Sequence, residues 1–548
     1  MPGPANTTPQ ILDTIVWRPD SPPDVDARFR GLPSVDAPPD YFRVWLWNLT
    51  NLAEVRQGAK PRMAEVGPLT YRKYRLKLDA WWDRRGRVSV KEWDYHIFQP
   101  HLSSANPNDT ITTINLPLLG VLELLHAYGS AVPAVQTLID VLLGVLSGWR
   151  DRDHVDGLFM HRKAAELLWG YDDLLLQRLQ LLLGSSFVPY TTVRLLQNDT
   201  SAEQVIANQV ASVIDTGWRP EEEALGAAAN PRMEVEQGWR AVSSWGPNCS
   251  EPVRGTDAFQ FAPGVTRGSV LRVWITELFR SAVLLFKEEV ELHGVRMLRF
   301  EPDPAESAPD VCHRQRIRGM ANVTAPTAVG PTGNGSSPAA HGVPILMSLP
   351  HYCLVDDAVA GALEGVACDL PTHATFIDVE PNTGITMRAA KRLQLSSEIT
   401  DSARATLEPG LRNATILPVF WAEEASQISP EQGAAFAATV YAAQRLAARL
   451  AAVGYPAATV LALVAAAAAA TAVLHPRGGP TAAAEAGSVR DTGANGHPTP
   501  ELTAPLLGDG GGAAAVASAS AAEVGGLEDA TGGSRGGRQE EQQQQQQG

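Results

Sequence analysis

The feature that most constrains this chain is an uncharged, apolar stretch near its C-terminus. Residues 451–474 contain no Asp, Glu, Lys or Arg, and the stretch lies between Arg449 and Arg477. As an α-helix with a rise of about 1.5 Å per residue, it covers the roughly 30 Å hydrocarbon core of a bilayer. Much of it is alanine, including the unbroken run 465–470. The stretch predicts a transmembrane helix, and an alanine-rich helix outside a membrane is the alternative.

The asparagines indicate the cellular compartment of the rest of the chain. Eight of the fifteen stand in Asn-X-Ser/Thr with X other than proline, the acceptor for N-glycosylation. Ordinary Ser and Thr frequencies give roughly two in fifteen by chance. This excess predicts that the chain before the apolar stretch is lumenal or extracellular. The eight acceptor positions are Asn6, Asn48, Asn108, Asn198, Asn248, Asn322, Asn334 and Asn413.

The four cysteines are compatible with the same compartment. They are Cys249, Cys312, Cys353 and Cys368, and none belongs to a C-x-x-C pair. A zinc site or a redox motif is therefore not expected. Two disulfide bonds are expected if the domain is lumenal or extracellular, and four reduced core cysteines if it is not.

The N-terminal segment, residues 1–40, offers no route into that compartment. It is rich in proline and has no apolar run long enough for a signal peptide or a membrane span. Either the sequence starts downstream of such a segment, or the glycosylation interpretation is wrong. We expect the first.

Hydrophobic patterning predicts an α+β domain over residues 41–450. Residues 41–115 read as strands and turns, and strand-like patterns return after Ser185. Between them, residues 116–185 carry apolar side chains at helical spacing and predict a helical insert. Residues 475–548 contain no aromatic residue and end in a glutamine run. Such a composition cannot bury a core, so we expect a disordered cytoplasmic tail.

Charge and motif content disfavour a nucleic-acid partner and catalysis. The formal net charge is −15, which makes nucleic acid an unsuitable partner. The only G-x-S-x-G sequence, residues 532–536, lies in the tail, without the strand and helix that a nucleophile elbow requires. No H-E-x-x-H and no phosphate-binding G-x-x-x-x-G-K occurs. We expect no catalytic residues, no metal and no cofactor.

A series of short motifs, in a fixed order, carries a family resemblance. It opens in residues 48–74 with Gly-x-x-Pro followed by Glu-x-Gly-Pro-x-x-Tyr, and its most distinctive run is Glu-Leu-Leu-Trp-Gly-Tyr at 166–171. Over about residues 11–474 the chain resembles the class B scavenger receptors and lysosomal integral membrane proteins, the fatty-acid translocase-like family. Further members of the series are 98–100, 255–257, 348–352, 378–381, 390–394 and 417–421.

The resemblance implies an antiparallel β-barrel with a helical bundle at its apex and a lipid-carrying tunnel. The insert 116–185 falls where the bundle is expected. The family has a membrane span at each end, so the first span would precede this sequence. The resemblance also implies a Cys249–Cys312 bridge, whereas Cys353 and Cys368 have no counterpart and are paired by parity alone.

The expected function follows from the same resemblance. It is a receptor in the plasma membrane or an endosomal or lysosomal membrane, which binds lipids, fatty acids or lipoproteins and conducts hydrophobic cargo through the tunnel. An alternative is a lysosomal membrane protein that docks and delivers a hydrolase. His154 and His161 in the insert are then candidate pH sensors, because histidine changes charge between pH 5 and 8. A lipid-metabolising enzyme is a third class, disfavoured by the missing catalytic motifs.

Overall fold

The computed structural model divides the chain into two units, Met1–Ala467 and Ala468–Gly548. The sheet, the helices around it and the cavity described below all belong to the first unit. The second unit is described only up to Leu474, as the end of a helix. The structure describes residues 16–32, 40–129, 155–185, 188, 190–197, 201–218, 231–246, 248–333, 342–401, 403–404, 408, 411 and 416–474.

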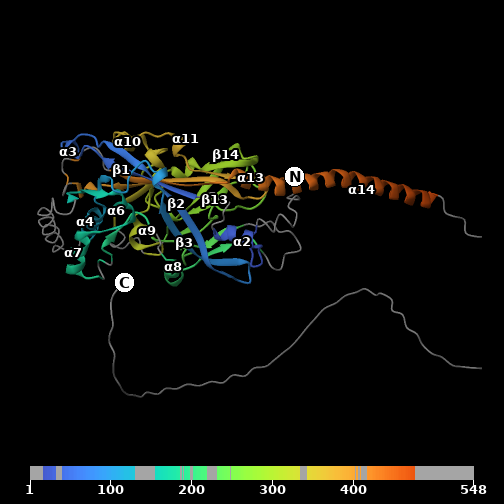
Figure 1. Cartoon of the computed structure of the whole chain (residues 1–548), viewed down its shortest axis with the longest axis horizontal. Helices are drawn as coiled ribbons and strands as arrows, with labels where there is room; N and C mark the ends of the chain where they lie inside the picture. Colours follow the sequence, from blue (N-terminus) through green and yellow to red (C-terminus); the bar gives the residue numbers. More distant parts are fainter. Residues whose placement is uncertain are drawn as a thin grey trace, which may run out of the picture. The chain divides into compact units, whose positions relative to one another are not determined.

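One antiparallel sheet of 13 strands dominates the first unit (Figure 1). Its path runs β10-β9-β3-β2-β1-β20-β19-β18-β15-β14-β13, and β16 and β17 join it through β19. The chain's first and last long strands, β1 and β20, are neighbours, which ties the two ends of the domain together. The strands are β1 (Asp40–Leu49), β2 (Met63–Trp82), β3 (Arg87–Phe98), β9 (Ser212–Asp215), β10 (Arg232–Val235), β13 (Leu271–Ile275), β14 (Arg280–Leu292), β15 (Val295–Pro302), β16 (Ala321–Asn322), β17 (Ile345–Ser348), β18 (Phe376–Val379), β19 (Thr386–Glu398) and β20 (Ile416–Gln427).

A short segment between the two edge strands nearly closes this sheet. The amide of Met233 in β10 donates to the carbonyl of Gly255 at 2.7 Å. The amide of Thr256 donates to the carbonyl of Arg272, and that of Trp274 donates to the carbonyl of Thr256, both at 3.0 Å in or beside β13. Gly255 has φ +94°, and a Cβ there would lie 2.5 Å from the Arg272 carbonyl oxygen. The Gly-Thr-Asp motif is therefore explained by the close approach of these backbones.

The predicted helical insert is partly strand. Strand β6 pairs with β4 and β5 in a three-stranded sheet, and every one of its residues has a partner in β4. The helices α4, α6 and α7 gather at the end of the sheet away from α13 (Figure 1). The elements of this region are β4 (Thr110–Ile114), α4 (Leu116–Gly129), β5 (Val155–Asp156), β6 (Phe159–Lys163), α6 (Ala164–Trp169), β7 (Tyr171–Asp172), α7 (Leu174–Leu183) and β8 (Thr192–Val193).

Local sequence sets the starts of the two longer helices here. The side chain of Asn115 accepts a hydrogen bond from the amide of Leu118 at 3.1 Å, and that of Asp173 accepts from the amide of Leu176 at 3.0 Å. Both are N-caps that satisfy amides left without a partner in the first helical turn. The remaining described helices before α14 are short. They are α2 (Pro23–Arg30), α3 (Leu52–Val55), α8 (Ala202–Asn208), α9 (Thr324–Val329), α10 (Asp357–Ala360), α11 (Leu370–His373) and α13 (Pro430–Phe436), beside the small strands β11 (Ala241–Val242) and β12 (Glu251–Pro252).

The α+β prediction with an antiparallel, barrel-like sheet is confirmed. The N-terminal segment contributes more than its proline content suggested, since Trp17, Val25 and Phe29 are buried with Val88 of β3 and Ile214 of β9 in one hydrophobic cluster. Residues 16–32 are thus part of the folded domain. These contacts pack helix α2 against the sheet.

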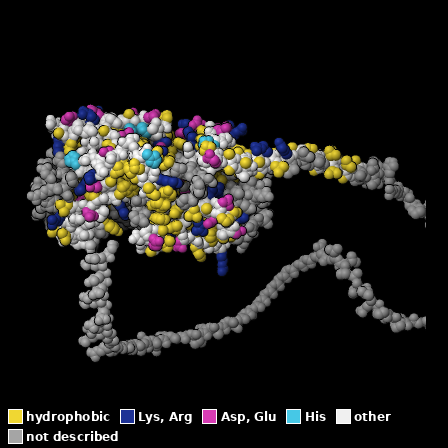
Figure 2. Space-filling view, in the orientation of Figure 1, with side chains coloured by type: hydrophobic (Ala, Val, Ile, Leu, Met, Phe, Trp, Pro, Cys, Tyr) yellow, Lys and Arg dark blue, Asp and Glu magenta, His cyan; other side chains and the backbone are white. Residues whose placement is uncertain are grey.

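Helix α14, Ala442–Leu474, contains residues 451–474, the predicted membrane span. Along it, the side chains drawn in colour are mostly hydrophobic (Figure 2). The basic residues Arg445 and Arg449 stand near its start in the sequence. Among the helices in the described part of the chain, none is both long enough and apolar enough to cross a membrane. The predicted tail, 475–548, lies outside the described residues.

Candidate functional site: an amphipathic cavity

A cavity of about 1270 Å³ lies between the sheet and the helices of the insert. This exceeds the ~300–1,000 Å³ of usual small-molecule sites. Helices α4 and α7 and strands β17, β19 and β20 supply its apolar walls. The apolar residues include Leu116, Val121, Leu124, Leu125, Leu176, Leu179, Leu183, Ile345, Met347, Leu393, Leu395 and Phe420.

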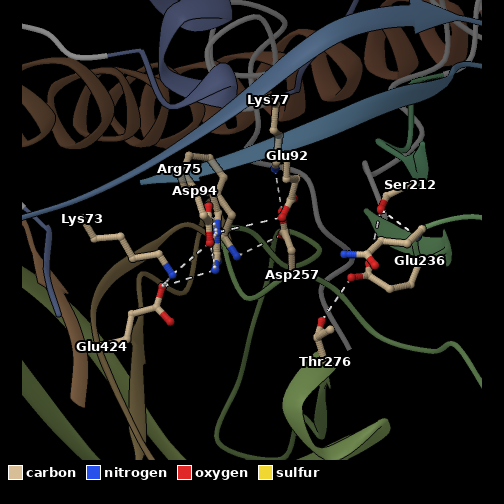
Figure 3. Close-up of polar contacts among 12 residues, drawn as sticks. Lys73, Arg75, Lys77, Glu92, Asp94, Ser212, Glu236, Asp257, Thr276 and Glu424 are labelled. Atoms are coloured by element: carbon tan, nitrogen blue, oxygen red, sulfur yellow. Dashed lines mark hydrogen bonds and ion pairs between the residues drawn. The ribbon is translucent and has the colours of Figure 1, made fainter. Parts of the chain in front are cut away.

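The cavity becomes ionic where β2, β3, β19 and β20 line it. Along β2, Lys73, Arg75 and Lys77 alternate with Tyr74 and Leu76, and alternate residues of a strand face the same side. The neighbouring strands place carboxylates opposite these cations: Arg75 pairs in register with Asp94 of β3. Figure 3 shows these side chains converging from separate strands. We call the following nine residues the ionic cluster: Lys73, Arg75, Lys77, Glu92, Asp94, Asp257, Glu277, Lys391 and Glu424.

Glu424 of β20 is the centre of the ionic cluster. Its carboxylate lies 2.8 Å from Nζ of Lys73, 2.9 Å from Nζ of Lys391 and 3.6 Å from a guanidinium nitrogen of Arg75. Burial alone would raise its pKa, but the charges of Lys391, Lys73 and Arg75 hold that pKa well below its usual range. Glu424 is therefore ionised at any physiological pH.

Two further pairs are also ionised. Asp94 lies 3.1 Å from Arg75, and although burial opposes ionisation, the charges of Arg75 and Lys73 lower its pKa to about 2. Lys77 lies 2.6 Å from Asp257. Burial would lower the pKa of Lys77, but the charge of Asp257 raises it overall. The ionic cluster is thus a set of mutually compensated charges inside the domain.

Glu236 differs from the carboxylates of the ionic cluster, because its described side-chain partners are hydroxyls and not cations. It is 6% exposed and follows β10, where its carboxylate accepts hydrogen bonds from the hydroxyls of Thr276 at 3.1 Å and Ser212 at 3.4 Å. Within the described residues, no ion pair links it to a cation. Burial, with the nearby charge of Glu92, raises its pKa to about 7. Figure 3 shows Glu236 between the two hydroxyls, next to the ionic cluster.

The four cysteines form two disulfide bonds. Cys249 is bonded to Cys312 and Cys353 to Cys368, and their sequence separations are 63 and 15 residues. Neither bond lines the cavity. Both disulfide bonds cross-link loops that connect strands.

The glycosylation positions differ in accessibility. Asn108 and Asn248 are exposed in loops. Asn48 is half-buried, and its side-chain oxygen accepts from the amide of Thr112 at 2.9 Å. Asn322 is also half-buried. Glycosylation at these sites stays a prediction, and Asn6, Asn198, Asn334 and Asn413 lie outside the described residues.

The two histidine candidates do not form a described pair. His161 of β6 is half-buried, and its Nδ1 lies 2.9 Å from the hydroxyl of Thr112. His154 lies outside the described residues. Their role as pH sensors stays a prediction.

The ionic cluster and Glu236 were not singled out in the sequence. The alternation of cations at 73, 75 and 77, followed by acidic residues at 92 and 94 after a turn, was the available signal for the first. A two-stranded hairpin places such residues opposite each other. No local pattern marks Glu236, since its partners come from β9 and from the turn after β13. Among the described residues, no group of three or more His, Cys, Asp or Glu is arranged to hold a metal.

The fold and the cavity together define a class: a barrel-like domain with an interior that is partly apolar and partly ionic. The model of the CD36 family matches residues 35–469. Human lysosome membrane protein 2 is 27% identical over 395 residues, covering 72% of this chain and 76% of its own length. Bovine scavenger receptor class B member 1 is 25% identical over 403 residues, covering 72% of each chain.

The chain belongs to the CD36 family. This confirms the resemblance seen in the ordered motifs. Members of the family are receptors rather than enzymes, and the chain is a membrane receptor of the scavenger type with the bulk of its residues extracellular or lumenal.

Proposed function

We propose that this receptor binds lipids or lipoprotein particles and passes hydrophobic cargo through the cavity of its ectodomain. The observation that carries this proposal is the cavity of about 1270 Å³ with walls of Leu, Val, Ile, Met and Phe. An acyl or sterol chain gains about 0.8 kcal/mol for each methylene that leaves water for such walls. Similarity to scavenger receptor class B member 1 supports the same function.

Transfer of a radiolabelled sterol ester tests the proposal. Donor emulsion particles would be mixed with vesicles that carry the full chain, and label in the vesicles measured over time. Ala422 of β20 lines the cavity, so Ala422→Trp should narrow it and lower the rate of transfer. Gln427 is exposed on the same strand, and Gln427→Trp is the matched control. Equal transfer by both variants would show that cargo does not use the cavity.

A second candidate function is docking of a lysosomal hydrolase. It is favoured by the exposed end of α7, where Leu181 and Leu182 are 78% and 72% exposed, and by similarity to lysosome membrane protein 2. Exposed leucines on one helix are suited to a protein partner. In a pull-down of lysosomal hydrolases at pH 7, the double substitution Leu181→Ser and Leu182→Ser should remove the hydrolase. Undiminished capture would exclude this surface.

A further inference from the structure

Every cation of the ionic cluster already has a carboxylate partner. The cluster contains four cations and five carboxylates, so its formal charge is −1 when all nine are ionised. The pairs are Lys73 with Asp94 and Glu424, Arg75 with Glu92, Asp94 and Glu424, Lys77 with Asp257, and Lys391 with Glu277 and Glu424.

The part of the ionic cluster that lines the cavity is balanced. Three of its cations and three of its carboxylates are lining residues, together with the hydroxyl of Thr276. The rest of the wall that they adjoin is mostly apolar. A ligand with its chain against α4 and α7 would therefore present its polar end to paired charges. The lining members are Lys73, Arg75, Lys391, Asp94, Glu277 and Glu424.

An anionic head group is unfavourable at this position. It would lose its hydration and add a negative charge beside carboxylates that already neutralise every cation, so its own charge would stay uncompensated in the domain, which is costly. The excess carboxylate of the cluster adds repulsion. An uncharged head group that bears hydroxyls has neither problem, because it can donate to carboxylate oxygens and accept from Lys73 or Lys391 without changing the charge balance.

We propose that the ionic cluster selects cargo by head-group charge: the cavity accepts amphiphiles with an uncharged, hydroxyl-bearing head group and rejects the corresponding carboxylates. This rests on the proposed lipid-binding function and narrows its ligand class, since ionised fatty acids become poor ligands. Arg194 is a further lining cation, exposed after β8 and outside the ionic cluster. It is a second place where an anion could bind, and it is tested separately.

Three ligands with one chain and different head groups test the selection. Mono-oleoylglycerol, oleate and oleylamine would be bound to the purified full chain at pH 8.5, below their critical micelle concentrations, so that oleate is an anion and oleylamine a cation. Wild type should bind mono-oleoylglycerol at least about tenfold more tightly than oleate, as expected for one unbalanced charge about 10 Å away at an effective dielectric constant near 20. Oleylamine should also bind more tightly than oleate, because its positive charge offsets the excess carboxylate of the ionic cluster.

Removing one carboxylate should reverse the discrimination. Glu424→Gln leaves the cluster neutral and frees three cations from one partner, so the affinity for oleate relative to mono-oleoylglycerol should rise about tenfold. Glu277→Gln should act in the same direction with less risk to folding, because its side chain is 46% exposed. Glu289→Gln is the matched control, since Glu289 pairs with Arg267 on the surface, where their side chains are 58% and 69% exposed.

The outcomes separate the two proposals. Wild type that binds oleate as tightly as mono-oleoylglycerol, or more tightly than oleylamine, would overturn the selection while leaving lipid binding intact. Oleate binding that Arg194→Gln abolishes, with no response to Glu424→Gln or Glu277→Gln, would also overturn it. Failure of all three ligands to bind would overturn the proposed function itself.

Discussion

Replacing Glu236 by glutamine should change how the stability of the domain depends on pH. The carboxyl of Glu236 is buried with two hydroxyl donors, Thr276 and Ser212. Its pKa is about 7, against 4.5 for an exposed glutamate. Each pKa unit is worth about 1.4 kcal/mol, so ionising this group in the folded state costs about 3 kcal/mol more than in the unfolded state.

The sign follows from proton binding. Between pH 4.5 and 7 the folded chain keeps a proton on Glu236 that the unfolded chain has lost. The free energy of unfolding is therefore highest, as far as this group is concerned, below pH 4.5, and it falls as the pH rises to about 7. Glutamine cannot ionise, so the free energy of unfolding of Glu236→Gln does not show this decrease.

Denaturant unfolding of the purified chain, followed by tryptophan fluorescence from pH 4.5 to 8, measures the effect. The free energy of unfolding of Glu236→Gln, minus that of wild type, should grow by about 3 kcal/mol across this range. Other titrating groups cancel in this difference. Among them is His373, whose pKa is lowered by burial and by the charge of His351. Glu289→Gln should give a flat difference. A flat difference for Glu236→Gln as well would refute the reasoning.

Three further predictions concern the framework. Asp378 is fully buried and lies 2.7 Å from both Arg299 and Arg388, so Asp378→Ala should lower the free energy of unfolding by about 3–5 kcal/mol; a loss below 1 kcal/mol in urea titration would contradict this. Serine at both Cys249 and Cys312 opens a 63-residue loop and should cost about 4 kcal/mol, whereas an unchanged denaturation midpoint would speak against it. Asn108→Gln and Asn248→Gln should each remove one glycosidase-sensitive step in gel mobility, and unchanged mobility would show that these exposed loops carry no glycan.

The sequence was informative where a motif reflects backbone geometry. Gly255 and Thr256 belonged to the ordered motif series, and the structure shows why: they join the two edges of the sheet, and no Cβ fits at Gly255. His351 in the Ser-Leu-Pro-His-Tyr run is a second motif residue whose structural role is visible. Its Nδ1 accepts from the amide of Ala367, and its Nε2 donates to Glu65 at 2.7 Å, so it fastens a loop to β2.

The ionic cluster shows what a single sequence conceals. Lys73, Arg75 and Lys77 look like the solvated face of a strand, because charged residues are usually exposed. Only the curvature of the sheet turns that face inward, and only pairing with distant strands supplies Glu424 and Lys391. Strand β6, residues 159–163, was predicted as helix because its leucine-rich neighbours gave the whole insert a helical pattern.

Photo-crosslinking with a mono-oleoylglycerol analogue that carries a diazirine on its acyl chain tests the central claim most directly. The full chain would be labelled in membranes, digested and analysed by mass spectrometry. The cavity account predicts adducts on the wall residues of α4 and β19, such as Leu124 and Leu395, and fewer of them in Ala422→Trp. Adducts confined to α14 and the outer surface, unchanged in that variant, would contradict it.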